Sequence, residues 1–307
     1  MLALVNTPSA PIPVELREVP EPQPAPNEAI VEVHAFSLNR GELALLANRP
    51  EGWRPGQDIA GVIVKAATDS SGPKEGTRVV ALADGGGWAQ RVAAPTARMA
   101  VLPDNVSFAS AATLPVAGLT ALRTLRQGGA LLQQRVLIIG AAGGVGRFAV
   151  QLAALSGAEV TAVVGRPERA EGLTERGATA IVTNIQQAEG LFDLILESVG
   201  GASLAGAISK VAPDGTIVMF GNTSRQETSI SFPNFAGHAR ARLLAFFIYE
   251  SGTPASMGID LAKLVSLVAA GKLNPDIGLE DSWHNLYRAT AALRDRNVNG
   301  KAVFHVD

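Results

Sequence analysis

The sequence predicts an α/β protein in two parts, an antiparallel strand-rich region followed by a doubly wound parallel sheet of six strands. Residues 1–117 contain short strands separated by turns rich in Gly, Pro, Asp and Ser, a spacing typical of a small barrel or folded sheet. Strands and helices then alternate through residues 118–249, as in a parallel sheet with its ligand at the carboxyl ends of the strands. Residues 135–166 read as strand, glycine turn, helix and strand, which is a βαβ unit.

The first part begins its strands after a proline-rich turn. Residues 28–34, EAIVEVH, alternate apolar and polar side chains, which predicts a strand with one buried face. Further strands are expected at residues 59–65, 78–82 and 89–92.

Helical signals begin at Ser107, a residue type that caps helices, and continue after Pro115. The six strands of the second part are expected at residues 136–139, 160–164, 178–182, 192–196, 215–220 and 243–248. The last 60 residues or so predict helices at 261–270 and 283–294 and a strand at 301–306. This tail is expected to complete the first domain, which gives one domain of residues 1–117 and 250–307 around a second of residues 118–249.

The glycine turn of the βαβ unit is suited to a dinucleotide. Ala141, Gly143 and Gly146 occupy the three positions of the dinucleotide pattern, with alanine replacing the first glycine. Such a turn lets the backbone approach the pyrophosphate, and the N–H groups at the helix start face the anion. We expect the pyrophosphate at Gly143, Gly144 and Val145. The alternative is a glycine turn in another kind of α/β protein.

The end of the second strand bears on the cofactor. An NAD site normally places an Asp or Glu there for the ribose 2′-OH, whereas this chain has Gly165, Arg166 and, slightly later, Arg169. The planar fork of arginine binds phosphate oxygens in pairs, so the sequence favours NADPH over NADH. Both arginines could instead be solvated residues that open the next helix at Pro167.

Composition excludes several classes of protein. The 307 residues carry a formal net charge of −2, which predicts no nucleic-acid partner, and contain no cysteine, which excludes disulfides and cysteine-ligated zinc. No uninterrupted apolar run is long enough to span a membrane, and the first residues lack the pattern of a signal peptide. We therefore expect a cytoplasmic protein with no membrane partner.

Seven segments, in order, resemble the medium-chain dehydrogenase/reductase superfamily and its zinc-independent quinone oxidoreductase (zeta-crystallin-like) branch. They are SLNRGEL (37–43), PGQDIAGVI (55–63), GGGWAQRV (85–92), LPVAGLTAL (114–122), GAAGGVGRFAVQLA (140–153), SVGG (198–201) and FGN (220–222). The resemblance covers nearly the whole chain. It implies a GroES-like β-barrel catalytic domain around a Rossmann domain, NADPH as the hydride donor, and commonly a homodimer.

Zinc-dependent relatives differ from this chain at two places. They carry a metal-binding cysteine near the position of Asn39 and a His-Glu pair where Gln57 and Asp58 stand. The four histidines are scattered, without metal-ligand spacing, so we expect no metal.

The resemblance also suggests site residues. Asn39 matches an asparagine beside the nicotinamide, where its amide could orient a substrate carbonyl; a turn asparagine is the alternative. Arg40, next to it, either lines the active site or pairs with Glu42. Thr120 matches a residue on the nicotinamide side, or is a plain helix threonine. Lys301 either reaches a cofactor phosphate or is solvated.

Further cofactor contacts are expected where strands of the second part end, since open sheets bind ligands there. They are Ser198, Val199, Phe220, Gly221 and Asn222, together with Phe247 and Ile248 at the sixth strand. Trp53 and Trp88 are either pocket walls or core residues.

The expected reaction is hydride transfer from NADPH to a quinone or an α,β-unsaturated carbonyl, a small-molecule substrate that needs no metal. No general acid stands out in the sequence, so the proton is expected from water. An enoyl-thioester reductase of a biosynthetic pathway and a non-catalytic NADPH-binding regulatory protein are the alternatives.

Overall fold

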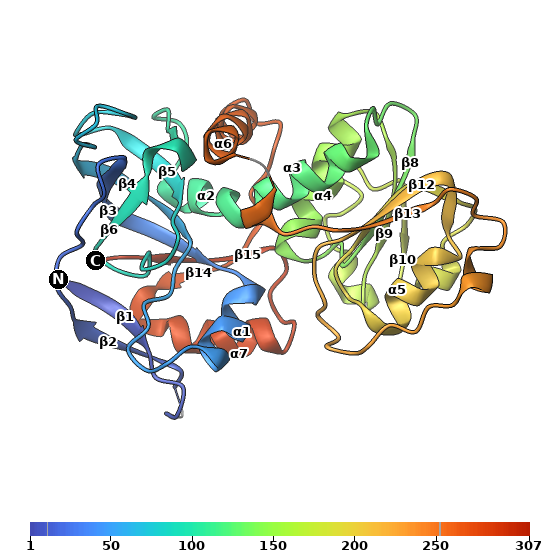
Figure 1. Ribbon diagram of the computed structural model, residues 1–307, viewed down its shortest axis with the longest axis horizontal. Helices are drawn as coiled ribbons and strands as arrows, with labels where there is room; N and C mark the ends of the chain where they lie inside the picture. The colour runs from blue at the N-terminus through green and yellow to red at the C-terminus, as the bar shows by residue number, and fades with distance from the viewer. Residues whose placement is uncertain (11, 252) are drawn as a thin grey trace. The chain divides into compact units, whose positions relative to one another are not determined.

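The computed structural model describes residues 1–10, 12–251 and 253–307 and divides the chain into two compact units. The first comprises Met1–Leu119 and Gly252–Asp307, and the second comprises Thr120–Ser251. We call them the barrel unit and the Rossmann unit; their elements are labelled in Figure 1.

The barrel unit is built on one curled sheet. Its hydrogen-bonded path runs β14-β15-β3-β4-β5-β7, β6 pairs with β3, and β1 and β2 form a separate antiparallel pair. The strands are β1 (Leu2–Asn6), β2 (Val14–Glu18), β3 (Glu28–Leu38), β4 (Asp58–Lys65), β5 (Arg78–Leu82), β6 (Arg91–Pro95), β7 (Met99–Val101), β14 (Ile277–Ser282) and β15 (Lys301–His305).

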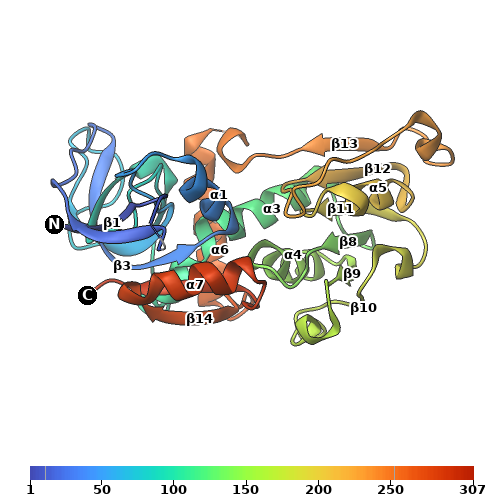
Figure 2. The same ribbon diagram turned by 90° about the horizontal axis from the view of Figure 1, so that it is seen from below.

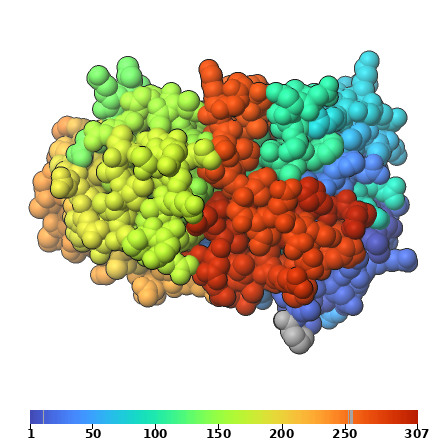
Figure 3. Space-filling view, turned by 180° about the vertical axis from the view of Figure 1, so that it is seen from behind, coloured from blue at the N-terminus to red at the C-terminus, as the bar shows by residue number. Residues whose placement is uncertain are grey.

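The C-terminal segment is part of this unit. β15 inserts between β14 and β3, where Ala302 pairs with Leu38. In Figure 3 the segment, in red, lies directly against the N-terminal region in blue. The core between them contains a stack of fully buried aromatic rings. The ring centroid of Phe36 lies 5.6 Å from that of Trp88 and 5.5 Å from that of Phe304. Trp88 is therefore a core residue, whereas Trp53 only packs against the core while partly exposed.

Helices cover the edges of the barrel unit. They are α1 (Arg40–Asn48), α2 (Phe108–Ala112), a π-helical turn (Leu114–Gly118), α6 (Pro254–Ala269) and α7 (Leu286–Arg294), with single 3-10 turns at Thr96–Arg98 and Trp283–Asn285. Ser107 caps α2 as expected, because its hydroxyl accepts from the backbone N–H of Ser110.

The Rossmann unit confirms the predicted parallel sheet of six strands. The order β10-β9-β8-β11-β12-β13 is that of a doubly wound dinucleotide-binding fold. The strands are β8 (Arg135–Ile139), β9 (Glu159–Val163), β10 (Ala180–Val182), β11 (Phe192–Glu197), β12 (Val211–Met219) and β13 (Arg242–Ala245). The helices are α3 (Leu119–Leu125), α4 (Gly144–Leu155) and α5 (Gly201–Ile208), with 3-10 turns at Arg126–Gly128, Pro167–Ala170, Ile185–Gln187, Phe232–Phe235 and Ile248–Glu250.

The helices of this unit pack on the strands that flank them in sequence. Figure 2 shows α4 beside β8 and β9, and α5 beside β11 and β12. The eight consecutive residues from Gly146 to Ala153 of α4 are buried, including Arg147 and Gln151, so the helix is covered on more than the single face that its apolar spacing indicates. Gly157 has φ of +82° just beyond the helix end, which confirms the predicted glycine cap.

Several predicted elements are shorter than expected; the strand expected at 178–182, for example, is only β10. The strand predicted at 243–248 ends at Ala245, and Ile248 begins a 3-10 turn; β13 is an edge strand without a second neighbour to extend it. The helix expected after Pro167 is only one 3-10 turn. Within the described ranges, no helix has both the length and the hydropathy needed to cross a membrane.

Candidate active site

A cluster of polar side chains lies inside the barrel unit where three strands meet. Ser37 is the penultimate residue of β3, Asp58 begins β4 and Lys301 begins β15. The antiparallel register pairs Ser37 with Asp58 on one side and with Val303 on the other. The sheet therefore gathers residues from the two ends of the chain at one edge, and Asn39 follows β3 directly at that edge.

Asp58 is the centre of this cluster. Its Oδ2 accepts hydrogen bonds from Ser37 Oγ at 2.7 Å, from Asn39 Nδ2 at 2.8 Å and from Lys301 Nζ at 3.1 Å. Its Oδ1 accepts from the backbone N–H of Val116 at 2.8 Å. Asp58 has no exposed surface and Lys301 is 2% exposed, so this is a buried ion pair in which every oxygen of the carboxylate is satisfied.

These contacts fix the orientation of the Asn39 amide. Its Oδ1 faces the ammonium of Lys301, at 2.5 Å, and its Nδ2 faces the carboxylate of Asp58. The reversed amide would place the amino group on the ammonium and the oxygen on the carboxylate, both repulsive. Asn39 is partly exposed, and its amide retains one N–H for a ligand.

Glu42, in the first turn of α1, extends the cluster. It is fully buried, its Oε2 accepts the N–H of Asn39 at 2.8 Å, and its Oε1 has no hydrogen-bond partner among the described residues. Burial, and next the charge of Asp58, raise the pKa of Glu42 to about 8. The side chain therefore carries a proton at neutral pH, and the buried cluster of Lys301, Asp58 and Glu42 is electrically neutral.

Arg40 points elsewhere in the same unit. Its Nη2 donates to the carbonyl oxygen of Leu293 at 2.8 Å, in the last turn of α7. A catalytic role for Arg40 stays a prediction.

The glycine turn of the Rossmann unit has the shape that a pyrophosphate requires. Gly140 has φ of +81°, and a Cβ on Gly146 would lie 2.4 Å from the Gly140 carbonyl oxygen, so neither position tolerates a side chain. Gly143 precedes α4 without a side-chain cap, and Gly144 and Val145 start the helix. The N–H of Gly143 donates to the Gly140 carbonyl oxygen at 3.0 Å, and the N–H groups of Gly144 and Val145, in the first turn of the helix, are available to an anion.

One of the two predicted arginines lies at this turn. Arg169 Nη2 donates to the carbonyl oxygen of Ala142 at 3.3 Å. Gly165 and Arg166 follow β9 and are exposed, and nothing lies within 4 Å of a Cβ built on Gly165. The backbone beyond β9 is thus open beside a guanidinium that already contacts the glycine turn.

The ends of β11 and β12 lie against the same turn. Ser198 Oγ donates to the Ile139 carbonyl at 3.1 Å, and a Cβ on Gly221 would lie 3.0 Å from the Ser198 carbonyl oxygen. Val199, Phe220 and Asn222 adjoin them in sequence. The structure therefore brings five predicted residues to the carboxyl edge of the sheet.

Glu197, at the end of β11, was not predicted. Its buried carboxylate accepts from the N–H groups of Val199 and Gly200 and from Ser203 Oγ, and burial raises its pKa. It satisfies the backbone N–H groups where α5 begins. A carboxylate that directly follows an apolar strand was the available signal.

Three predicted cofactor residues have less distinctive surroundings. Thr120 is 6% exposed and its carbonyl accepts from Thr124 Oγ; Phe247 is 63% exposed, whereas Ile248 is 8% exposed. Lys301 is bonded to Asp58 and Asn39, and the geometry favours a role in fixing Asn39 over the predicted contact with a cofactor phosphate.

The described part of the chain contains no group of three His, Cys, Asp or Glu side chains placed to hold a metal ion. The sequence did not predict that Asp58 and Glu42 belong to the site. Glu42 was named only as a possible partner of Arg40, and Asp58 only as one of two residues at the position of a His-Glu pair in zinc-dependent relatives. A charged residue opening the apolar strand DIAGVIVK was the signal that a buried partner was needed.

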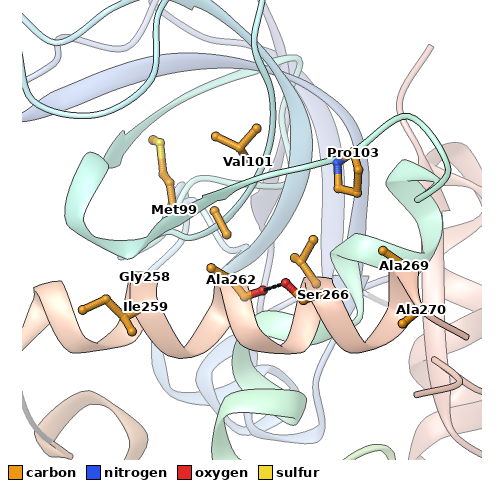
Figure 4. Close-up of a pocket in the computed structure, with 11 residues that line it drawn as sticks. Met99, Val101, Pro103, Gly258, Ile259, Ala262, Ser266, Ala269 and Ala270 are labelled. Atoms are coloured by element: carbon orange, nitrogen blue, oxygen red, sulfur yellow. Dashed lines mark hydrogen bonds between the residues drawn. The ribbon is translucent and has the colours of Figure 1, made fainter. Parts of the chain in front are cut away.

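A groove in the barrel unit lies between β7 and α6. Figure 4 shows it lined by Met99, Val101, Pro103, Gly258, Ile259, Ala262, Ser266, Ala269 and Ala270. The hydroxyl of Ser266 is bonded to the Ala262 carbonyl oxygen at 2.9 Å. No ionisable side chain lines the groove, so it offers no group for acid–base chemistry.

Two family models match the chain. Residues 25–104 match the alcohol dehydrogenase GroES-like domain, and residues 144–264 match the model described as zinc-binding dehydrogenase.

Individual proteins agree with these matches. The chain is 31% identical over 313 residues to the highly reducing polyketide synthase apmlA of Arthrinium phaeospermum, covering 92% of this chain and 13% of the relative. It is 37% identical over 164 residues to the chloroplast envelope quinone oxidoreductase homolog of Arabidopsis thaliana, covering 48% and 50% of the two chains. It therefore spans only part of these relatives.

The fold agrees along the full length with a solved structure. The Escherichia coli quinone oxidoreductase complexed with NADPH has a TM-score of 0.89 and 22% identity, and all of both chains is covered. The GroES-like and dinucleotide-binding matches, together with the quinone oxidoreductase relatives, place this chain in the medium-chain dehydrogenase/reductase superfamily, in its zinc-independent quinone oxidoreductase branch.

Proposed function

We propose that the chain is an NADPH-dependent reductase that transfers a hydride to a quinone or an α,β-unsaturated carbonyl without zinc. The observation that carries the cofactor choice is the contact between Arg169 and Ala142, which puts a guanidinium at the glycine turn. The strand before it ends in Gly165 and Arg166, where an NAD site needs a carboxylate. The NADPH in the structural relative from Escherichia coli agrees with this choice.

The residues of the Rossmann unit fit this cofactor. The close approach at Gly146 leaves a bare backbone cradle at Gly143–Val145 for the pyrophosphate, and Arg166 and Arg169 would hold the 2′-phosphate. Bound NADPH supplies the hydride. Its nicotinamide half would lie along the strand ends, at Ser198, Val199, Phe220, Gly221, Asn222, Phe247 and Ile248, with Thr120 on the same side.

In the barrel unit, we assign Asn39 to the substrate. Lys301 and Asp58 hold its amide in one orientation, so the remaining N–H can donate to a substrate carbonyl oxygen without rearrangement. That hydrogen bond strengthens as the oxygen gains negative charge during hydride transfer. The proton that completes the reduction is assigned to water.

The similarity to part of a highly reducing polyketide synthase supports one alternative within the same chemistry, reduction of an enoyl thioester. A protein that binds NADPH and only regulates a partner is the other alternative. The functional domains are proposed to divide at residues 117/118 and 249/250, and the protein is proposed to act as a cytoplasmic homodimer.

NADPH oxidation assays separate these proposals. Naphthoquinone, a simple enone and a crotonyl thioester are each offered with NADPH, and consumption is followed by absorbance. Turnover of the quinone or enone is expected to exceed that of the thioester. The reverse order selects the thioester alternative, and NADPH binding without turnover of any compound selects the regulatory one.

The cofactor assignment has its own test. Replacing Arg166 and Arg169 by alanine should weaken NADPH binding about tenfold or more, because each guanidinium makes a charge-assisted hydrogen bond, and should leave NADH binding nearly unchanged. Dissociation constants are measured by calorimetry, with Arg126→Ala, an exposed arginine of the same unit, as the control. Equal losses for the two cofactors would refute the 2′-phosphate site.

A further inference from the structure

Arg54 lies on a loop that is tied to the start of β4. Its carbonyl oxygen accepts the N–H of Gly86 at 3.0 Å, Gly87 N–H donates to Gly56 at 3.0 Å, and Ala83 N–H donates to Gln57 at 2.8 Å. The loop before β4 and the loop after β5 thus run together as an extension of the sheet.

Register puts this extension at the same edge as Asn39. Asp58 pairs with Ser37 of β3 and with Leu82 of β5, so residues 54–57 and 83–87 continue past the edge at which the buried cluster lies. Arg54 therefore lies beyond the same strand ends that Asn39 follows, within the barrel unit.

The side chain of Arg54 is partly buried but has no anionic or carbonyl acceptor. Its Nε is buried without a hydrogen-bond partner, and no described residue accepts from its guanidinium or forms an ion pair with it. Burial lowers the pKa of the Arg54 guanidinium. A guanidinium remains protonated in proteins all the same, so a half-buried positive charge has no acceptor among the described residues.

The other partly buried arginines of the barrel unit show how unusual this is. Each donates to a carboxylate or a backbone carbonyl: Arg17 to Glu15, Arg40 to Leu293, Arg78 to Pro103 and Val106, Arg91 to Glu21, and Arg98 to Asp84. Burying a charge without a partner is costly. Arg54 is the exception, which indicates that the acceptor for its guanidinium is a bound molecule rather than a residue of this chain.

The surroundings of the guanidinium keep it accessible. It lies over Gly86, with Nη2, Cζ and Nε 3.7 to 3.8 Å from where a Cβ would be, and Gly86 has φ of +73°, which favours glycine. Gly85 and Gly87 flank Gly86, so the guanidinium of Arg54 lies against backbone that carries no side chains. A second buried donor without a partner, Trp88 Nε1, belongs to the next residue of this loop.

We propose that Arg54 binds an oxyanion of the substrate, so that the preferred substrates are quinones, enones or enoyl thioesters that carry a carboxylate or a phosphate. The inference rests on the proposed reductase function and narrows its substrate class. The fork of arginine matches both oxyanions through paired N–H···O bonds. An anion on Arg54 would hold the substrate at the strand ends that also carry Asn39 and would give the guanidinium a partner.

Matched pairs of substrates test the proposal. Benzoylacrylate and its methyl ester differ in one ionised carboxylate, and crotonyl phosphopantetheine and crotonyl pantetheine differ in one phosphate. The ratio of kcat/KM between charged and neutral members is measured for the wild type, Arg54→Gln and Arg54→Lys. Arg49→Gln is the control, since Arg49 is an exposed arginine five residues away and its loss changes the net charge equally.

The wild type should prefer the charged member of at least one pair, and Arg54→Gln should lower kcat/KM for that member about ten- to a hundredfold. For the neutral member, kcat/KM should change less than about twofold. For the charged member, kcat/KM of Arg54→Lys should lie between those of the wild type and Arg54→Gln, because lysine keeps the charge but lacks the planar fork of N–H donors. If the wild type prefers the charged substrate of the first pair, the oxyanion that Arg54 binds is a carboxylate. If it prefers the charged substrate of the second pair, the oxyanion is a phosphate. Equal losses for charged and neutral members, or no preference in the wild type, would overturn the proposal.

Binding separates this result from failure of the reductase function. Calorimetry compares benzoylpropionate, which cannot be reduced at an alkene, with its methyl ester on the NADP⁺-loaded protein. If no compound is reduced but Arg54→Gln binds benzoylpropionate more weakly than the wild type does, the oxyanion site stands and the reductase function fails. If the two proteins bind it equally, the oxyanion site is refuted whether or not turnover occurs.

Discussion

Replacing Glu42 with glutamine should change how the stability of the protein depends on pH. Glu42 has no exposed surface, and its pKa is raised from 4.5 to about 8, chiefly by burial. In the unfolded chain it ionises near pH 4.5, whereas in the folded protein it holds its proton to about pH 8. The folded state therefore binds more protons between these values, and the free energy of unfolding falls as pH rises.

The size of the effect follows from the shift. One pKa unit corresponds to about 1.4 kcal/mol, so ionising Glu42 in the folded protein removes roughly 4–5 kcal/mol of stability as an upper limit. The contribution is fully present below about pH 4.5, declines across the interval and is lost above about pH 8. Glu42→Gln has no proton to lose and keeps an oxygen that can accept the Asn39 N–H.

Urea unfolding followed by circular dichroism at pH 5, 7 and 9 measures the difference. The wild type should be about as stable as Glu42→Gln or more stable at pH 5, and less stable by several kcal/mol at pH 9. Glu18→Gln, an exposed carboxylate on β2, should parallel the wild type at all three values. A constant gap between wild type and Glu42→Gln across this range would refute the assignment of a protonated Glu42.

Three other expectations follow from the geometry. Lys301→Met should cost about 3–5 kcal/mol in urea unfolding, because it leaves Asp58 buried without its cation; combining it with Asp58→Asn should recover part of that loss, and additive losses would contradict the buried pair. Gly146→Ala should abolish NADPH binding in calorimetry, because its Cβ would lie 2.4 Å from a backbone oxygen. Gly143→Ala, whose Cβ would lie 3.4 Å from the Gly140 carbonyl oxygen, should bind at least tenfold better than Gly146→Ala; equal binding by both variants would refute the steric argument. Leu243→Lys, on the exposed edge strand β13, should convert the proposed homodimer to a monomer in light scattering, and an unchanged mass would exclude this edge as the interface.

The sequence predicted best the elements whose pattern is local. Residues 136–139 and 160–164 are apolar and rich in β-branched side chains, and both became central strands of the parallel sheet, β8 and β9, with ends shifted by one residue. The strand predicted at 243–248 was too long because apolar residues continue past Ala245, although Phe247 is 63% exposed. β14, with the sequence IGLEDS, was missed because it is half-exposed and carries two acids.

The site was predictable in the same uneven way. Arg169 could be placed near the glycine turn because a βαβ unit fixes the distance between its strand ends, and Asn39 was found through the family segment that contains it. The contact between Lys301 and Asp58 could not be predicted, since 243 residues separate them. Only the insertion of β15 beside β3 brings them together, and nothing in either local sequence specifies that pairing.

The neutrality of the buried cluster connects its stability to its proposed chemistry. With Glu42 protonated, the charges of Lys301 and Asp58 cancel, and the amide of Asn39 presents its remaining N–H in a neutral setting. Ionisation of Glu42 adds a negative charge to a carboxyl group that accepts the backbone N–H of Asn39 itself. A substrate oxygen bound to the Asn39 amide would gain negative charge during hydride transfer, so the two charges would repel. The rate of reduction should therefore fall as pH rises through about 8, and Glu42→Gln should remove that decline while leaving the rate at pH 6 nearly unchanged. A decline that persists in Glu42→Gln would assign the ionisation to another group and remove the electrostatic link between Glu42 and Asn39.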